Sequence, residues 1–122
     1  MASTSKPEEL RGRTKRFALL ILKLFQSLPR TDEARILGRQ LLRSATSVAA
    51  NYRAVCRARS KKEFIAKLGI VLEEADECLL WLELLEEGGI LGGDRTEDLH
   101  REANELAAIF NASLRTAKSS RD

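Results

Sequence analysis

The stretch ARILGRQLLRSATSVAANYRAV, residues 34–55, decides the fold of this chain of 122 residues. Its apolar side chains recur every three or four residues, which is the spacing of one face of an α-helix. No proline interrupts the stretch, and Thr31 or Asp32 can cap its start. We therefore predict a long helix over residues 32–58. Its apolar stripe consists of Ala34, Leu37, Leu41, Ala45, Val48, Tyr52 and Val55.

The chain must turn directly after this helix, around Arg57-Ala58-Arg59. Ser60-Lys61-Lys62-Glu63 has the S-x-x-E pattern of a capping box and stands just before another run with helical apolar spacing. This run predicts a third helix over residues 61–87. Gly88-Gly89 supply the left-handed backbone positions that commonly end a helix, so we expect the third helix to stop there.

Two further helices flank this pair. Residues 7–28 show the same apolar spacing and are followed by Pro29, which predicts the first helix. Asp94, with Glu97 three residues later, has the pattern of a helix start, and we predict the fourth helix over residues 95–117.

The composition favours helices and excludes a mostly-β fold. Leu, Ala, Glu, Arg and Lys dominate, there are two prolines, and 5% of the residues are aromatic. The length fits a single domain over residues 1–122, with flexible ends at residues 1–6 and 118–122. Because the connections are short, neighbouring helices must run antiparallel. We therefore predict an all-α, antiparallel up-down-up-down four-helix bundle.

More apolar residues are present than one bundle interior requires. Burial of a helix on a second side is most simply achieved against another subunit, so we expect a homo-oligomer. The additional apolar residues are Leu19, Leu20, Leu22 and Phe25 on the first helix and Ile65, Ile70, Trp81 and Leu84 on the third.

The lack of a signal peptide and of a membrane span, together with the two cysteines, predicts a cytoplasmic protein. The longest apolar run, Phe17 to Leu22, is far shorter than the roughly 20 residues of a bilayer span, and the N-terminal residues lack the pattern of a signal peptide. We expect no membrane contact. Cys56 and Cys78 fall too far apart on successive antiparallel helices for a disulfide, and we interpret both as packing thiols in a reducing compartment.

No catalytic constellation is complete. Glu97 and His100 have the E-x-x-H spacing of di-iron bundles, but those sites need two such motifs and His100 is the only histidine. Cys56 has no histidine within its helix to activate it. The glycines of residues 88–93 lack the Gly-Lys-Ser/Thr ending of a phosphate-binding loop. We therefore predict a protein that is not an enzyme, with no catalytic residues, no metal site and no cofactor.

A strip of polar side chains follows the second helix. These residues recur at about four-residue intervals, and acidic residues of the third helix can face them if the two helices pack side by side. We interpret the set as a buried, satisfied network that fixes packing register or a subunit contact, with a ligand or nucleic-acid site as the alternative. The strip consists of Gln40, Arg43, Ser47 and Asn51, and the facing residues are Glu73, Glu74 and Glu77.

These same residues carry a resemblance to a known family. The run from Gln40 to Asn51, followed by Arg59-Ser60-Lys61-Lys62-Glu63-Phe64-Ile65, resembles the bacterial four-helix-bundle family of 23S rRNA intervening-sequence proteins. The resemblance extends from about Phe17 to Leu85. The positions that match the family pattern are Arg43, Ser47, Asn51, Ser60, Phe64 and Glu77. Departures at Ala49, Tyr52-Arg53-Ala54-Val55 and Glu73-Glu74 suggest a distinct subgroup.

The resemblance implies a ring-shaped homopentamer of such bundles. It also implies kinship with the accessory variability protein of diversity-generating retroelements, a pentameric barrel whose basic surface engages nucleic acid and a reverse transcriptase. Some family members are encoded inside insertions in large-subunit ribosomal RNA genes, and many have no settled biochemical role.

The charge is divided along the chain. Residues 1–62 carry fifteen Lys and Arg against four Asp and Glu, whereas residues 63–98 carry two against eleven. We expect the basic turn to bind RNA or DNA weakly and without sequence preference, because few aromatic residues lie nearby to stack on bases. The charge division itself favours head-to-tail pairing of subunits first, with the acidic third helix meeting the basic surface of the next copy, and leaves the basic turn for an outside partner. The alternative function is an adaptor ring that binds a protein such as a reverse transcriptase. The basic turn consists of Arg53, Arg57, Arg59, Lys61 and Lys62.

Overall fold

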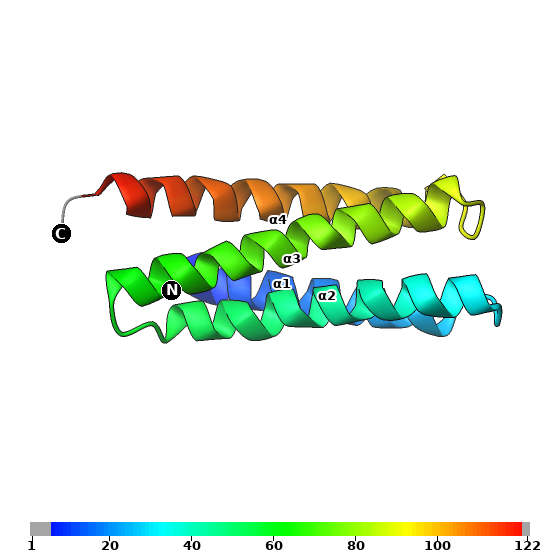
Figure 1. Cartoon of the computed structure of the whole chain (residues 1–122), viewed down its shortest axis with the longest axis horizontal. Helices are drawn as coiled ribbons and strands as arrows, with labels where there is room; N and C mark the ends of the chain where they lie inside the picture. Colours follow the sequence, from blue (N-terminus) through cyan, green and yellow to red (C-terminus); the bar gives the residue numbers. More distant parts are fainter. Residues whose placement is uncertain (1–5, 121–122) are drawn as a thin grey trace, which may run out of the picture.

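The structure, a computed structural model, describes residues 6–120. It contains four helices, α1 (Lys6–Gln26), α2 (Asp32–Cys56), α3 (Lys61–Glu87) and α4 (Gly93–Ser119). Figure 1 shows them lying along one long axis, each reversing the direction of the one before it. The predicted all-α up-down bundle is confirmed for the described residues.

The helix bounds differ from the predicted ones by at most two residues. Helices α1 and α2 end two residues early because the chain tightens there: the Ser27 amide donates to Leu24 O at 3.0 Å and the Arg57 amide to Ala54 O at 3.1 Å. Helix α4 extends two residues further at each end. Lys6 and residues 118–119 belong to helices and not to flexible ends, whereas residues 1–5 and 121–122 of the predicted ends lie outside the described residues.

Two of the predicted helix starts are confirmed by their caps. The Ala34 amide donates to Thr31 Oγ1 at 3.3 Å at the start of α2, and the Glu63 amide donates to Ser60 Oγ at 3.0 Å at the start of α3. The expected start of α4 at Asp94 is wrong. Gly92 occupies the cap without a side-chain hydrogen bond, and Asp94 lies within the first turn.

The connection between α3 and α4 needs one left-handed residue and not two. Gly89 has a φ of 76°, whereas Gly88 keeps a right-handed helical backbone. The amides of Ile90 and Leu91 both donate to Leu85 O at 3.0 Å, so a single reversal at Gly89 is enough to satisfy the end of α3.

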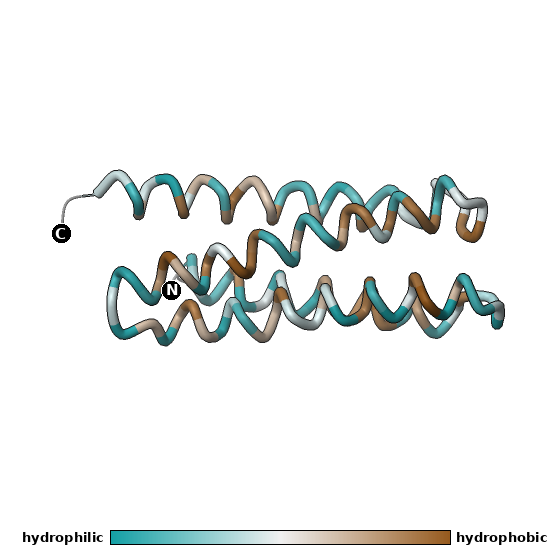
Figure 2. The backbone as a smooth tube through the Cα atoms, viewed as in Figure 1, coloured by the Kyte–Doolittle hydropathy of each residue, from teal (hydrophilic) through white to brown (hydrophobic). Residues whose placement is uncertain are grey.

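The core runs the length of the bundle and draws side chains from all four helices. Phe17, Val48, Leu82 and Phe110 are among the fully buried residues, and the rings of Tyr52 and Phe110 join α2 to α4 with centroids 5.6 Å apart. Figure 2 shows that apolar positions recur along each helix, separated by hydrophilic ones, as a bundle interior requires.

The four seams between neighbouring helices are unequal. The α2–α3 seam is the most extensive and the α1–α4 seam is the least. Across the α1–α4 seam, Arg13 binds Glu102 through two hydrogen bonds of 2.7 and 3.1 Å and also reaches Glu105 at 3.3 Å. The hydrogen bond to Glu102 is the main cause that raises the pKa of Arg13.

Several large apolar side chains remain exposed. Of the residues expected to need a second partner, Phe25, Ile65 and Trp81 are half-buried in the bundle and the other five are exposed. The structure adds Ile36 and Leu80 to this exposed set. None of the described helices is both long enough and apolar enough to cross a bilayer. The exposed apolar side chains are Leu19, Leu20, Leu22, Ile36, Ile70, Leu80 and Leu84.

Candidate nucleic-acid interface

The five residues of the predicted basic turn do not form one site. Arg59 approaches Glu63 at 4.0 Å, and Lys61 donates to the backbone carbonyl of Ser120, at the end of α4. Lys62 is exposed without a partner among the described residues. Arg53 and Arg57 point the other way, toward α1. The five basic side chains therefore point in different directions and do not converge on one site.

Arg53 and Arg57 line a groove together with Arg11 and Lys15 of α1. The groove has a volume of about 360 Å³, and Gly12 and Cys56 complete its lining. Each helix contributes two cations four residues apart, so that both lie on one helix face. We call this site the basic groove, defined by Arg11, Gly12, Lys15, Arg53, Cys56 and Arg57.

The basic groove has no carboxylate partner in the described part of the chain. Within residues 6–120, none of the four cations has an acidic group at ion-pair distance, whereas Arg13, Arg43 and Arg101 all do. Four positive charges from two helices therefore face one small volume without a counter-charge from residues 6–120. Such an arrangement favours anions, and above all phosphate groups.

The α1 half of the basic groove, Arg11 and Lys15, is not among the site residues predicted from the sequence. Their four-residue spacing matches that of Arg53 and Arg57, which was the available signal. That signal becomes specific only when the rotation of α1 against α2 is known.

The side chain of Tyr52 lies beneath this groove. The pKa of its hydroxyl is raised to about 12, mainly by burial and also by the neighbouring Cys56 thiol, while the positive charge of Arg11 acts in the opposite direction. The half-buried Cys56 is thus positioned between the core and the basic groove. Cys78 differs, because it is fully buried and burial raises the pKa of its thiol to about 12. Both thiols are free, as expected.

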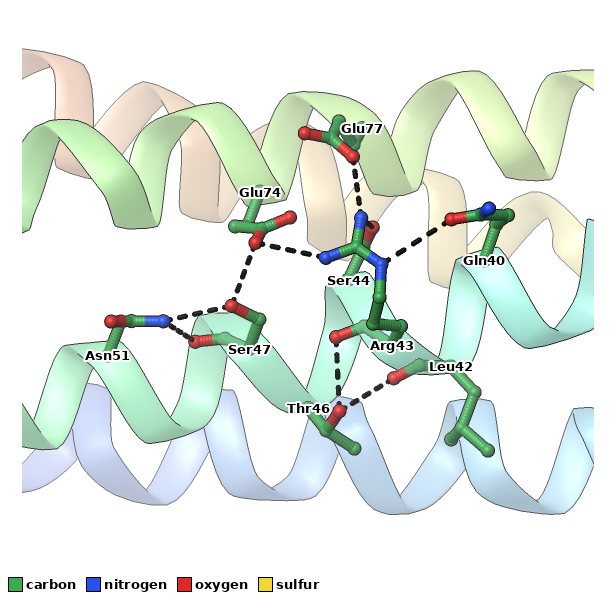
Figure 3. Close-up of polar contacts among 9 residues, drawn as sticks. All are labelled: Gln40, Leu42, Arg43, Ser44, Thr46, Ser47, Asn51, Glu74 and Glu77. Carbon is green, nitrogen blue, oxygen red and sulfur yellow. Dashed lines mark hydrogen bonds and ion pairs between the residues drawn. The ribbon is translucent and has the colours of Figure 1, made fainter.

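The polar strip on α2 contacts α3 as expected (Figure 3). Arg43 lies at its centre, binding Glu77 at 2.9 Å and Glu74 at 3.4 Å and donating to Gln40 Oε1 at 3.4 Å. Ser47 Oγ donates to Glu74 at 2.9 Å, and the Asn51 amide donates to Ser47 Oγ at 2.8 Å and to its carbonyl oxygen. One network therefore joins the two helices.

The expectation that this network is buried and satisfied is wrong. The Arg43 side chain is 53% exposed and that of Glu77 is 42% exposed, because both lie at the outer edge of the seam and not inside it. Glu74 is half-buried, and its buried Oε1 has no hydrogen-bond partner among the described residues. Glu73, which can face the strip by its spacing, is exposed and takes no part.

The E-x-x-H pair does not converge on a site. Glu97 pairs with Arg101 at 3.3 Å, while His100 lies 3.7 Å from Glu83 and contacts the Asn104 amide at 3.2 Å. These residues border an acidic groove of about 880 Å³ between α3 and α4. Over residues 6–120, no three His, Cys, Asp or Glu side chains are arranged to hold a metal ion.

Comparison with known proteins identifies the family. A family model described as 23S rRNA-intervening sequence protein matches residues 9–112, which include α2, α3 and most of α1 and α4. The chain belongs to the 23S rRNA-intervening sequence protein family. This confirms the resemblance and extends it beyond residues 17–85 in both directions, so that the basic groove lies within the family match.

A solved structure supports the family and the fold. The chain is similar to a protein of unknown function from the S23 ribosomal protein family of Bacteroides thetaiotaomicron, with 31% sequence identity and a TM-score of 0.80. The alignment covers 85% of this chain and 96% of that one. No curated protein matches the chain.

Proposed function

We propose that this 23S rRNA-intervening sequence protein is a non-enzymatic, oligomeric bundle that binds RNA or DNA weakly and without sequence preference. The observation that carries the proposal is the basic groove, where four cations from α1 and α2 meet without an acidic partner among the described residues. Contacts to phosphates are independent of sequence, and their strength scales with the number of phosphates neutralised. No aromatic side chain lines the groove to stack on a base.

The location of the groove supports contact with an extended strand. It lies between the start of α1 and the end of α2, at the end of the bundle that also holds the α2–α3 connection (Figure 1). Arg59 is exposed on that connection, and Lys62 is exposed in the first turn of α3. A strand whose phosphates enter the groove is therefore able to continue past further positive charge.

Binding to a mixed-sequence single-stranded RNA without terminal phosphates tests the proposal. We expect detectable binding at low salt that weakens steeply as salt is added, with a slope of log K against log salt of about −3 if four cations each neutralise a phosphate. Arg53→Gln with Arg57→Gln should weaken binding about tenfold and lower the magnitude of the slope by about 1.4. Fluorescence anisotropy over a salt series measures both.

A matched control separates the groove from overall charge. Arg95→Gln with Arg101→Gln removes the same charge from α4, near the opposite end of the bundle (Figure 1). Because salt screens charges at that distance from the groove, this variant should change the RNA affinity by less than about twofold. Equal losses in both double variants would show that only net charge matters. Absence of binding by the unaltered protein at low salt would refute the proposal.

The oligomeric part of the proposal is supported by two outward faces of unlike character. The outer face of α1 presents Leu19 between Arg16 and Lys23, and that of α3 presents Leu80 near Glu73 and Asp76, all of them exposed. Two such faces of different copies are complementary in charge and both apolar at the centre. Because the faces are unlike, pairing is head-to-tail, and such pairing gives a ring when the rotation between successive copies closes. We propose the pentameric ring that the family resemblance implies.

A further inference from the structure

The basic groove is more highly charged than contact with an ordinary strand requires. Three guanidinium groups and one ammonium group line a volume of about 360 Å³, which lies at the lower end of the range of small-ligand pockets. An internal phosphodiester carries one negative charge. Four cations around a single phosphodiester therefore leave most of the positive charge unbalanced.

A phosphate monoester fits this charge better. At neutral pH it carries between about −1.5 and −2 charges and has three acceptor oxygens in place of two. Arginine forks are suited to such a group because each guanidinium can donate two parallel hydrogen bonds to its oxygens. Arg11, Arg53 and Arg57 supply three forks from two helices, and Lys15 adds a point charge.

The backbone of α1 leaves room for this group to approach. Gly12 lies between Arg11 and Lys15, and a Cβ placed on it would meet nothing within 4 Å. Cys56 of α2 lines the same volume. The walls of the groove are therefore cationic, and part of its lining lacks the side chain that would otherwise occupy the space above Gly12.

We propose that the basic groove binds the phosphate monoester at the end of a nucleic-acid strand, so that this protein prefers strand ends that carry a phosphate. The inference rests on the proposed function and deepens it, because it names the part of the nucleic acid that occupies the groove.

Oligoribonucleotides that differ only in their ends test the inference. We expect a 5′-phosphorylated or a 3′-phosphorylated strand to bind about five- to tenfold more tightly than the same strand with hydroxyls at both ends, and the two arms distinguish which end is held. Arg11→Gln with Lys15→Gln should abolish this difference. Arg95→Gln with Arg101→Gln should preserve it, and thermal melting of each variant verifies that it is folded.

The two cysteines provide a second readout in the unaltered protein. Cys56 lines the groove, whereas Cys78 is fully buried and burial raises its pKa to about 12, so a neutral alkylating agent should modify Cys56 first. Inorganic diphosphate, used as the probe, should slow alkylation of Cys56 severalfold at constant ionic strength. It should have no such effect in the Arg11→Gln, Lys15→Gln variant.

The outcomes separate the inference from the proposed function. Salt-sensitive binding with equal affinity for all strand ends overturns the inference and leaves the proposed function standing. Protection of Cys56 by diphosphate without any RNA binding overturns the proposed function. It also overturns the inference, because no strand end is then held, and the groove would be a site for free phosphates. If diphosphate does not slow alkylation of Cys56 and strands with and without a terminal phosphate bind equally well, both readouts overturn the inference.

Discussion

Arg13 is the residue that most directly joins the first helix to the last. It makes two hydrogen bonds to Glu102 and a further contact with Glu105, and its side chain is only 19% exposed. Arg13→Ala should lower the free energy of unfolding by about 1–2 kcal/mol, because partly buried charged hydrogen bonds are lost. Urea unfolding followed by circular dichroism measures the change.

Arg101 is the matched control for this prediction. It also forms two ion pairs, with Glu97 and Asp98, but all three side chains are largely exposed and belong to α4 alone. Arg101→Ala should therefore cost less than about 0.5 kcal/mol. If both variants lost the same stability, the ion pairs across the α1–α4 seam would have no special role.

Tyr52 should make the folded protein less stable at high pH. The pKa of its hydroxyl is about 12 in the folded protein, compared with the ordinary value of 10.0 that applies to the unfolded chain. Between these two pH values the folded protein keeps a proton that the unfolded chain has lost. Since the unfolded state then binds fewer protons, stability falls as the pH rises through this window. In Tyr52→Phe the fall in unfolding free energy from neutral pH to about pH 11 should be smaller.

Urea unfolding at several pH values checks this prediction. Cys78 has a pKa that is also raised, from 9.0 to about 12, and it causes a loss of stability in the same direction in both proteins. The difference between the two pH profiles therefore isolates Tyr52. Superimposable profiles would mean that the Tyr52 hydroxyl titrates as in the unfolded chain.

Gly38 determines how closely α1 and α2 approach each other. A Cβ at this buried position would lie 2.5 Å from Leu28 Cδ1 and 3.0 Å from Phe25 Cδ1. Gly38→Ala should lower the free energy of unfolding by about 1 kcal/mol, because the crowding outweighs a helix-propensity gain of similar size. Gly69→Ala in α3 meets nothing within 4 Å and should raise it by about 0.5–1 kcal/mol. Thermal and urea unfolding of the two variants give opposite signs if this account is correct.

The helices follow from local sequence, but their ends and contacts do so only in part. The Ser60 cap could be predicted because its hydroxyl and the Glu63 amide are three residues apart. The start of α4 could not, because Gly92 caps it without a side chain to mark it. Gly38 gave no sequence signal, since the side chains that would crowd a Cβ there, Phe25 and Leu28, belong to another segment.

The candidate site shows the same division. The contact of Arg43 with Glu74 and Glu77 follows from helix spacing once α2 and α3 pack side by side, but the same reasoning wrongly includes Glu73. The basic groove depends on how α1 is rotated against α2, which the spacing within either helix leaves undetermined. For that reason Arg53 and Arg57 were grouped with their neighbours in sequence and not with Arg11.

The whole molecule carries unlike charges on two outward faces, and this makes its assembly testable. Arg16→Glu with Lys23→Glu should dissociate the proposed ring, because the acidic residues of α3 in the next copy would then face like charge. Adding Glu73→Lys and Asp76→Lys to the same chain should restore assembly. Light scattering at moderate salt measures the mass of each variant. A monomeric mass for the unaltered protein, or no restoration in the fourfold variant, contradicts the head-to-tail arrangement.

The unequal seams of the bundle also determine how the chain reaches its structure. The three extensive seams join helices that are adjacent in sequence, so most contacts close only short loops and lose little chain entropy. Proteins dominated by such contacts fold in microseconds to milliseconds. Only the α1–α4 seam joins the two ends of the chain, and it is also the least extensive. We therefore expect packing of α1 against α4 to be the last step of folding, with the ion pairs of Arg13 forming after the other seams.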